Sequence, residues 1–250
     1  MLEWLDSGRF GATDFRLSGG TRPVTGALWL PEQYGADTPL VLCGHGASGD
    51  RYQAPLPHLA RRFVSEYAFA VLAIDGPVHG LRQVGEGGRV AFFAEMQRDG
   101  FIDDMVADWH GALDAVRADK TIGGQLGYFG LSMGTIFGVP LLASDIAVTA
   151  SVIGLCGTSG AAQIIGQRLA ADAAKIQHPL LFLMQLEDEL FDRDGYLALF
   201  DALASDDKRL HANPGLHPNV PAEEIAATVT FLGQHLSGNA PDRTIEPLAT

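Results

Sequence analysis

Cysteine is scarce in this chain of 250 residues, which contains only Cys43 and Cys156. Both lie in apolar runs, where a buried free thiol is the ordinary state of a cysteine. Two cysteines in such places exclude the disulfide framework that holds many small secreted domains together. The sequence therefore predicts a chain held by an apolar core in a reducing compartment, the cytoplasm.

Basic residues are also few, with 17 Lys and Arg against 30 Asp and Glu and a net charge of −13. A chain of this charge is repelled by nucleic acids and by anionic membrane surfaces, so we expect neither as a partner. The sequence also lacks an apolar run of about 18 residues, the length that a membrane-spanning helix needs. Its start, MLEWLDSGRFGATDF, lacks the basic and apolar segments of a signal peptide. We expect a soluble protein, and the sequence leaves its oligomeric state open.

Internal repeats and low-complexity linkers are absent, while hydrophobic residues make up 47% of the chain and charged residues 19%. This balance is typical of a globular protein with a sizeable core. The length suits one large domain. We expect a single domain over residues 1–237 and a loose tail over residues 238–250.

Short apolar runs alternate along the chain with stretches of helical spacing. Strands are expected at 10–17, 24–30, 39–45, 68–75, 125–132, 148–157, 179–186 and 208–214. Helices are expected at 51–67, 103–118, 133–143, 161–176, 194–204 and 222–236. Alternation of this kind predicts the α/β class, with a mostly parallel twisted sheet and helices on both faces. In such sheets ligands bind beyond the carboxyl ends of the strands.

Three polar residues follow three of these expected strands, in the order Ser132, Asp188 and His217. The serine lies in the stretch GLSMG, between Gly130 and Gly134, which matches the G-x-S-x-G pattern of a strained turn between a strand and a helix. A serine hydroxyl becomes a nucleophile when a base removes its proton, and a neutral histidine held by a carboxylate suits that task. The order predicts a catalytic triad.

Each member of this triad has a competing interpretation. Ser132 could be a structural residue of a glycine-rich turn, and His217 a surface histidine. Asp188 lies in an acidic loop where Glu187 is its chief competitor as the catalytic acid. The other late histidines fall inside expected elements or at the opposite end of the sheet, namely His178, His211 and His235.

The triad order, the glycine-flanked serine and the GHG stretch at residues 44–46 together resemble the α/β-hydrolase fold over about residues 10–236. Within it the chain is most similar to the dienelactone-hydrolase-like and prolyl-oligopeptidase-like serine esterases. The chain departs from many relatives at Gln185 or Leu186, where they carry glycine before the acid, and at Val78. The resemblance implies an α/β-hydrolase fold and a serine hydrolase that uses no cofactor.

An oxyanion hole needs two hydrogen-bond donors aimed at the developing negative charge. The resemblance implies the backbone N–H of Met133 as one donor and that of Ala47, or else Ser48, as the other. It also implies that His45 supports this loop, and we expect His45 to line the substrate pocket.

A metal site made from His45, His79 and Asp75 is the alternative for these residues, but their spacing does not match a common ligand motif. We therefore expect no metal.

Only about 22 residues separate the strand expected at 148–157 from the next, which leaves little room for a large cap domain. The other candidate cover is the glycine-containing segment 81–101. Its Phe92, Phe93 and Met96 either line the substrate pocket or pack against the core.

The expected reaction is hydrolysis of a carboxylic ester, lactone or thioester through an acyl-enzyme. The same triad would also serve an amidase, a peptidase or an acyltransferase. A hydrolase-fold protein that binds a small molecule without turnover is the alternative from a different class.

Overall fold

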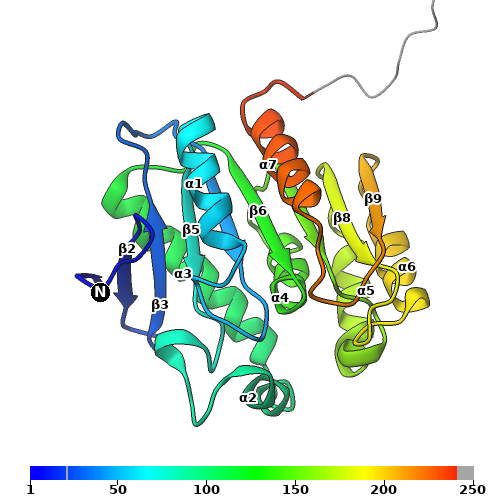
Figure 1. The fold of residues 1–250 in the computed structure, drawn as a ribbon. Coiled ribbons are helices and arrows are strands. Elements are labelled where there is room, and N and C mark those ends of the chain that lie inside the picture. The colour runs from blue at the N-terminus through cyan, green and yellow to red at the C-terminus, as the bar shows by residue number, and fades with distance from the viewer. Residues whose placement is uncertain (21, 241–250) are drawn as a thin grey trace, which may run out of the picture.

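Within residues 1–20 and 22–240, which the computed structural model describes, the chain forms one nine-stranded sheet with the order β1-β2-β3-β5-β4-β6-β7-β8-β9 (Figure 1). The strands are β1 (Leu2–Leu5), β2 (Thr13–Leu17), β3 (Val24–Trp29), β4 (Leu40–Gly44), β5 (Ala70–Ile74), β6 (Leu126–Leu131), β7 (Ala150–Gly154), β8 (Leu180–Gln185) and β9 (Lys208–Asn213). The pairings from β5 through β4 to β9 are parallel, and those joining β1, β2, β3 and β5 are antiparallel. The expected α/β-hydrolase sheet is confirmed.

Helices cover both faces of this sheet, as Figure 1 shows. One face carries α1 (Leu56–Tyr67) and α7 (Ala222–Leu236). The other carries α3 (Phe101–Lys120), α4 (Met133–Leu142), α5 (Gly166–Ala173) and α6 (Arg193–Ala202). Because both faces are covered, every residue of β4 to β8 is buried, which explains why these strands are continuous apolar runs rather than alternating ones.

The ligand-binding position of the fold follows from where the chain reverses direction across the sheet. After β4 the chain crosses one face through α1 to reach β5, and after β6 it crosses the opposite face through α4 to reach β7. Strands β4 and β6 are neighbours. Their connections therefore diverge and leave a crevice at their carboxyl ends, which is where ligands bind in such sheets.

The segment between β5 and α3 contains the 3₁₀ turn Gly80–Arg82 and a short helix, α2 (Gly88–Glu95). Figure 1 shows α2 below the sheet. No cap domain is evident in the described part of the chain, as expected. None of the helices that the structure describes is long and apolar enough to cross a membrane. Of the predicted tail, residues 241–250 lie outside the described residues.

Several boundaries differ from the sequence-based expectation. The edge strand β1 was not predicted, because a strand of four residues containing Glu3 has no clear apolar alternation. The helix expected over 51–67 begins only at Leu56. Arg51 instead turns into the protein, where its guanidinium lies 2.8 Å from both Asp14 and Asp75. The stretch 161–176 is divided into the 3₁₀ turn Gly160–Ile165 and α5.

Candidate active site

Ser132 joins β6 to α4 with backbone angles of φ 58° and ψ −117°, a conformation that residues other than glycine rarely adopt. Neighbouring strand β7 holds the turn in place. The Ser132 N–H donates to the carbonyl of Gly154 at 2.9 Å. Thr135 Oγ1 also donates to the Gly130 carbonyl at 2.8 Å and accepts from Gly154 N–H at 2.9 Å. These bonds keep a strained serine at the carboxyl edge of the sheet.

The two glycines around the serine are required by close approach of the backbone. A Cβ at Gly130 would lie 2.7 Å from the carbonyl oxygen of Gly134. A Cβ at Gly134 would lie 2.6 Å from the carbonyl oxygen of Gly44, at the end of β4. Side chains at either position would push α4 away from the sheet and displace Ser132.

The structure brings the three predicted triad residues into one chain of hydrogen bonds. His217 Nε2 lies 2.9 Å from Ser132 Oγ, and His217 Nδ1 lies 2.7 Å from Asp188 Oδ2. The histidine is 5% exposed and the carboxylate side chain is fully buried. Glu187, the competing acid, instead accepts a hydrogen bond from the backbone N–H of Gly215. The acid that faces the histidine ring is therefore Asp188.

Asp188 has more partners than the histidine alone. Its Oδ1 accepts from the backbone N–H groups of Leu190 at 2.7 Å and Phe191 at 3.1 Å, and its Oδ2 also accepts from the Tyr196 hydroxyl. Burial raises the pKa of this carboxyl, but the hydrogen bonds from His217, Tyr196 and Leu190 outweigh it and lower the pKa below its ordinary value. Asp188 is thus held ionised, which keeps the proton of His217 on Nδ1 and leaves Nε2 free to accept one.

Three supporting residues of the triad were not predicted from the sequence. Tyr196 lies on α6 and binds Asp188. Glu189 accepts the backbone N–H of His217 at 2.9 Å. Gln185 is buried and donates to the Asn219 carbonyl at 2.8 Å, which links β8 to the loop that carries His217. Each contact joins segments at least eight residues apart, so no local pattern marks it.

We expect Tyr196→Phe to lower kcat/KM about tenfold, because it removes a hydrogen bond of about 1.5 kcal/mol to the ionised Asp188.

The loss of this hydrogen bond in Tyr196→Phe also raises the pKa of Asp188 toward its ordinary value. A carboxyl whose pKa is lower in the folded state than in the unfolded chain stabilises the fold at any pH above its unfolded pKa of about 3.9. This stabilisation is lost as the pH falls through the pKa of the folded state. The stability difference from wild type should therefore be full at pH 7 and shrink below about pH 4. Chemical unfolding at several pH values checks this, with Tyr34→Phe, an exposed tyrosine, as the control. A difference that does not depend on pH would contradict it.

Met133 and Ala47, the two residues expected to supply the oxyanion donors, line the same cavity as Ser132. Met133 is the first residue of α4, so its N–H has no partner within the helix. The loop after β4 is oriented by His45, whose Nδ1 donates to the Gly46 carbonyl at 2.8 Å and whose Nε2 accepts from Gly76 N–H at 2.8 Å. In a trans peptide the carbonyl and the N–H point in opposite directions, so the Ala47 N–H is turned away from His45.

The expectation that His45 lines the substrate pocket needs correction. Its side chain is 2% exposed, and the residues that line the large cavity include its neighbours Gly44, Gly46 and Ala47 but not His45 itself. Burial, together with neighbouring His79, lowers the pKa of His45 to about 4, so the ring is neutral at pH 7. His45 supports the loop from behind.

The alternative of a metal site at His45, His79 and Asp75 finds no support in their contacts. The nitrogens of His79 face the carbonyl oxygens of Pro77 at 2.7 Å and Ala47 at 3.0 Å. Asp75 is engaged by Arg51. Among the residues that the structure describes, no group of three or more His, Cys, Asp and Glu side chains is arranged to hold a metal ion.

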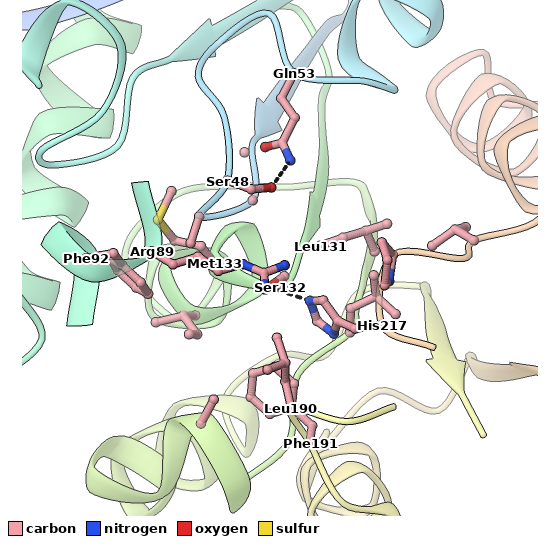
Figure 2. A pocket seen from close by; sticks show the side chains of 18 of the residues that line it. Ser48, Gln53, Arg89, Phe92, Leu131, Ser132, Met133, Leu190, Phe191 and His217 are labelled. Carbon is pink, nitrogen blue, oxygen red and sulfur yellow. Dashed lines mark hydrogen bonds between the residues drawn. The ribbon is translucent and has the colours of Figure 1, made fainter. Parts of the chain in front are cut away.

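A cavity of about 310 Å³ opens beside Ser132 and His217 (Figure 2). Its walls are mostly apolar and come from the loop after β4, the start of α1, α2, α4 and the loops that follow β8 and β9. Phe92, Phe93 and Met96 all line it, which answers the question that the sequence left open about segment 81–101. Phe92 and Met96 are buried as well, so they also belong to the core.

Comparison with known proteins gives structural relatives but no sequence family. No protein-family model matches the chain, and neither does any curated protein. The chain is similar to a cold-adapted esterase from an Arctic intertidal metagenomic library, solved with bound PEG, at 31% identity and a TM-score of 0.78 over 93% of this chain and 99% of that one.

Two more distant structures share the fold alone. An acetyl xylan esterase from Paenibacillus sp. R4 is 18% identical, with a TM-score of 0.69 over 94% of this chain and 88% of that one. An esterase from Pyrococcus furiosus is 15% identical, with a TM-score of 0.68 over 90% and 93% of the respective chains.

Proposed function

Because the chain belongs to the α/β-hydrolase superfamily, we propose that it is a serine esterase with Ser132, His217 and Asp188 as its catalytic triad. The observation that carries this proposal is the unbroken series of hydrogen bonds from Asp188 through His217 to Ser132, at the wall of an apolar cavity. The similarity to the metagenomic esterase at 31% identity supports it.

In the proposed mechanism, Ser132 Oγ attacks the ester carbonyl while His217 Nε2 takes the hydroxyl proton. Asp188 stabilises the imidazolium that forms. The oxyanion of the tetrahedral intermediate accepts hydrogen bonds from the N–H groups of Met133 and Ala47. His217 then gives its proton to the departing alcohol, and an acyl-enzyme remains on Ser132. Water, deprotonated by His217, attacks the acyl carbon, and its second tetrahedral intermediate collapses to release the acid and restore the serine.

The proposed substrate is a carboxylic ester, lactone or thioester of small to medium size. A cavity of about 310 Å³ is at the small end of ligand pockets, and its apolar walls favour uncharged acyl or alcohol groups over most of its surface. Backbone donors in the oxyanion hole fix the position of the carbonyl whatever the rest of the substrate is.

The test of this function is steady-state hydrolysis of 4-nitrophenyl esters with acyl chains from two to twelve carbons, beside a matched 4-nitroanilide. We expect faster ester than anilide turnover and release of the free acid. When methanol is added, most of the acyl groups should still be transferred to water and released as the free acid. A dominant methyl ester product would indicate an acyltransferase, preferred anilide turnover an amidase, and binding without turnover a receptor.

Phe93→Ala should shift the preferred acyl chain toward longer esters, because Phe93 lines the cavity and its removal lengthens it. The matched control is Val90→Ala, one helical turn away on α2 but 83% exposed. Comparing kcat/KM across the chain-length series checks this. An unchanged chain-length preference in Phe93→Ala, or the same shift in Val90→Ala, would contradict the prediction that Phe93 contacts the acyl chain.

We also propose that residues 1–237 form one domain, since both described core clusters lie against the same sheet. The proposed compartment is the cytoplasm. Cys43 and Cys156 are both buried and free, and burial raises the pKa of each thiol. We propose no nucleic-acid or membrane partner for a chain with a net charge of −13.

A further inference from the structure

Helix α2 presents one continuous face to the cavity. Three residues of α2 and the residue that follows it line the cavity at the helical spacing i, i+3, i+4 and i+7, namely Arg89, Phe92, Phe93 and Met96 (Figure 2). Three are apolar, as a helix face that covers an apolar pocket should be. The fourth, Arg89, places a permanent positive charge on the same face, and Figure 2 shows its side chain extending toward the middle of the cavity.

Arg89 is the only Lys, Arg, Asp or Glu among the described residues that line this cavity. No described carboxylate forms an ion pair with it. The nearby acid of α2, Glu95, is engaged by Arg22 at 2.9 Å and by Arg98 at 3.0 Å. A chain with 30 Asp and Glu residues thus leaves this arginine without an acidic partner in the described structure.

An arginine on a surface helix often lays its stem on apolar neighbours and keeps its charge in water. Two observations favour a recognition role here. Arg89 and Phe93 are exposed, but both line the cavity together with the buried Phe92, and the same cavity contains Ser132 and His217. Guanidinium groups bind carboxylates with paired, charge-assisted hydrogen bonds, which are stronger than those between neutral groups.

We propose that Arg89 binds the carboxylate of an anionic ester, so that the preferred substrates carry a free carboxylate beside the ester bond that is cleaved. This inference rests on the proposed esterase function and narrows its substrate class. The carboxylate could belong to the acyl part, as in a half-ester of a dicarboxylic acid, or to the alcohol part. The chemistry at Arg89 is the same in both cases.

Two pairs of esters, each differing only by carboxylate against carboxamide, separate these sources. Phenyl hydrogen glutarate and phenyl glutaramate test the acyl side, and 4-acetoxybenzoate and 4-acetoxybenzamide test the alcohol side. The anionic-to-neutral ratio of kcat/KM is measured in wild type, Arg89→Gln and Arg61→Gln. Arg61 is exposed on α1 and does not line the cavity, so it controls for the loss of one positive charge. Comparing ratios between enzymes cancels the intrinsic reactivity of the esters.

We expect the ratio for at least one pair to fall about tenfold or more in Arg89→Gln, the size of a lost charge-assisted hydrogen bond. Arg61→Gln should keep the wild-type ratio. Arg89→Lys should keep part of it, because lysine retains the positive charge but lacks the paired N–H donors of the guanidinium group. Equal ratios in wild type and Arg89→Gln for both pairs would overturn the proposal. An equal fall in Arg61→Gln would also overturn it, because net charge would then explain the effect.

A binding measurement separates failure of this inference from failure of the esterase function. Calorimetric titration of Ser132→Ala with the same four esters reports affinity without turnover. We expect tighter binding of one anionic ester over its amide, and loss of that preference in Ser132→Ala/Arg89→Gln. If wild type hydrolysed no ester but this preference held, the anion site would stand and the esterase proposal would fall. If wild type hydrolysed esters but this preference were absent, the esterase proposal would stand and the anion site would fall.

Discussion

Ser132→Ala lowers kcat/KM for a 4-nitrophenyl ester by about 10,000-fold or more, if Ser132 is the nucleophile. No other described hydroxyl is placed at 2.9 Å from His217 Nε2, so no neighbouring side chain takes over the attack. The measurement compares steady-state kinetics of wild type and variant after repeated purification to exclude contaminating esterases. Ser48→Ala is the matched control, because Ser48 also lines the cavity but its Oγ accepts a hydrogen bond from Gln53 at 2.8 Å. A Ser132→Ala enzyme within tenfold of wild type would contradict the proposed mechanism.

The same position tests whether the turn is strained. Ser132→Gly should be more stable than Ser132→Ala by about 1 kcal/mol, because glycine occupies φ 58° without the steric cost that alanine retains. Both variants lack the hydroxyl, so the comparison isolates the backbone. Equal free energies of unfolding would mean that the turn stores no strain.

His217→Ala should lower kcat/KM by about 10,000-fold or more, because it removes the base for the attack and the acid for the departing alcohol. Asp188→Asn should cost about 10,000-fold, the size seen when a triad histidine is held in the wrong tautomer. The physical reason is that an amide in place of Oδ2 donates to Nδ1 and moves the histidine proton to Nε2, facing the serine.

The matched control for His217→Ala is His58→Ala, since His58 is exposed on α1 and outside the cavity. Both should fold with unchanged circular dichroism. Full activity in His217→Ala would leave the serine without its base and would require a different residue to fill that role.

The sequence was sufficient to predict eight of the nine strands of the sheet and the three residues that the structure joins by hydrogen bonds at Ser132. Buried parallel strands are continuous apolar runs, and the close approach of backbone segments around Ser132 requires Gly130 and Gly134, so both features can be recognised in the local sequence. The triad residues follow from their places after β6, β8 and β9.

What the sequence could not predict depends on contacts between distant segments. Gln185, at the end of β8, donates a hydrogen bond to Asn219 in the loop after β9, and Arg51, which was expected in a helix, contacts Asp14 and Asp75 instead. The direction of a side chain on a short helix is equally hidden. In the sequence, nothing distinguishes Arg89 from the other charged residues nearby. The structure shows that Arg89 lies on the face of α2 that lines the cavity with Phe92 and Phe93.

Covalent labelling with a fluorophosphonate probe at neutral pH, followed by peptide mapping by mass spectrometry, tests the central claim most directly. The account predicts one labelled residue, Ser132, with labelling that collapses in His217→Ala and Asp188→Asn although both variants remain folded. A folded wild-type protein that accepts no probe, or that carries it on a different serine, would contradict the assignment of an activated nucleophile at this turn.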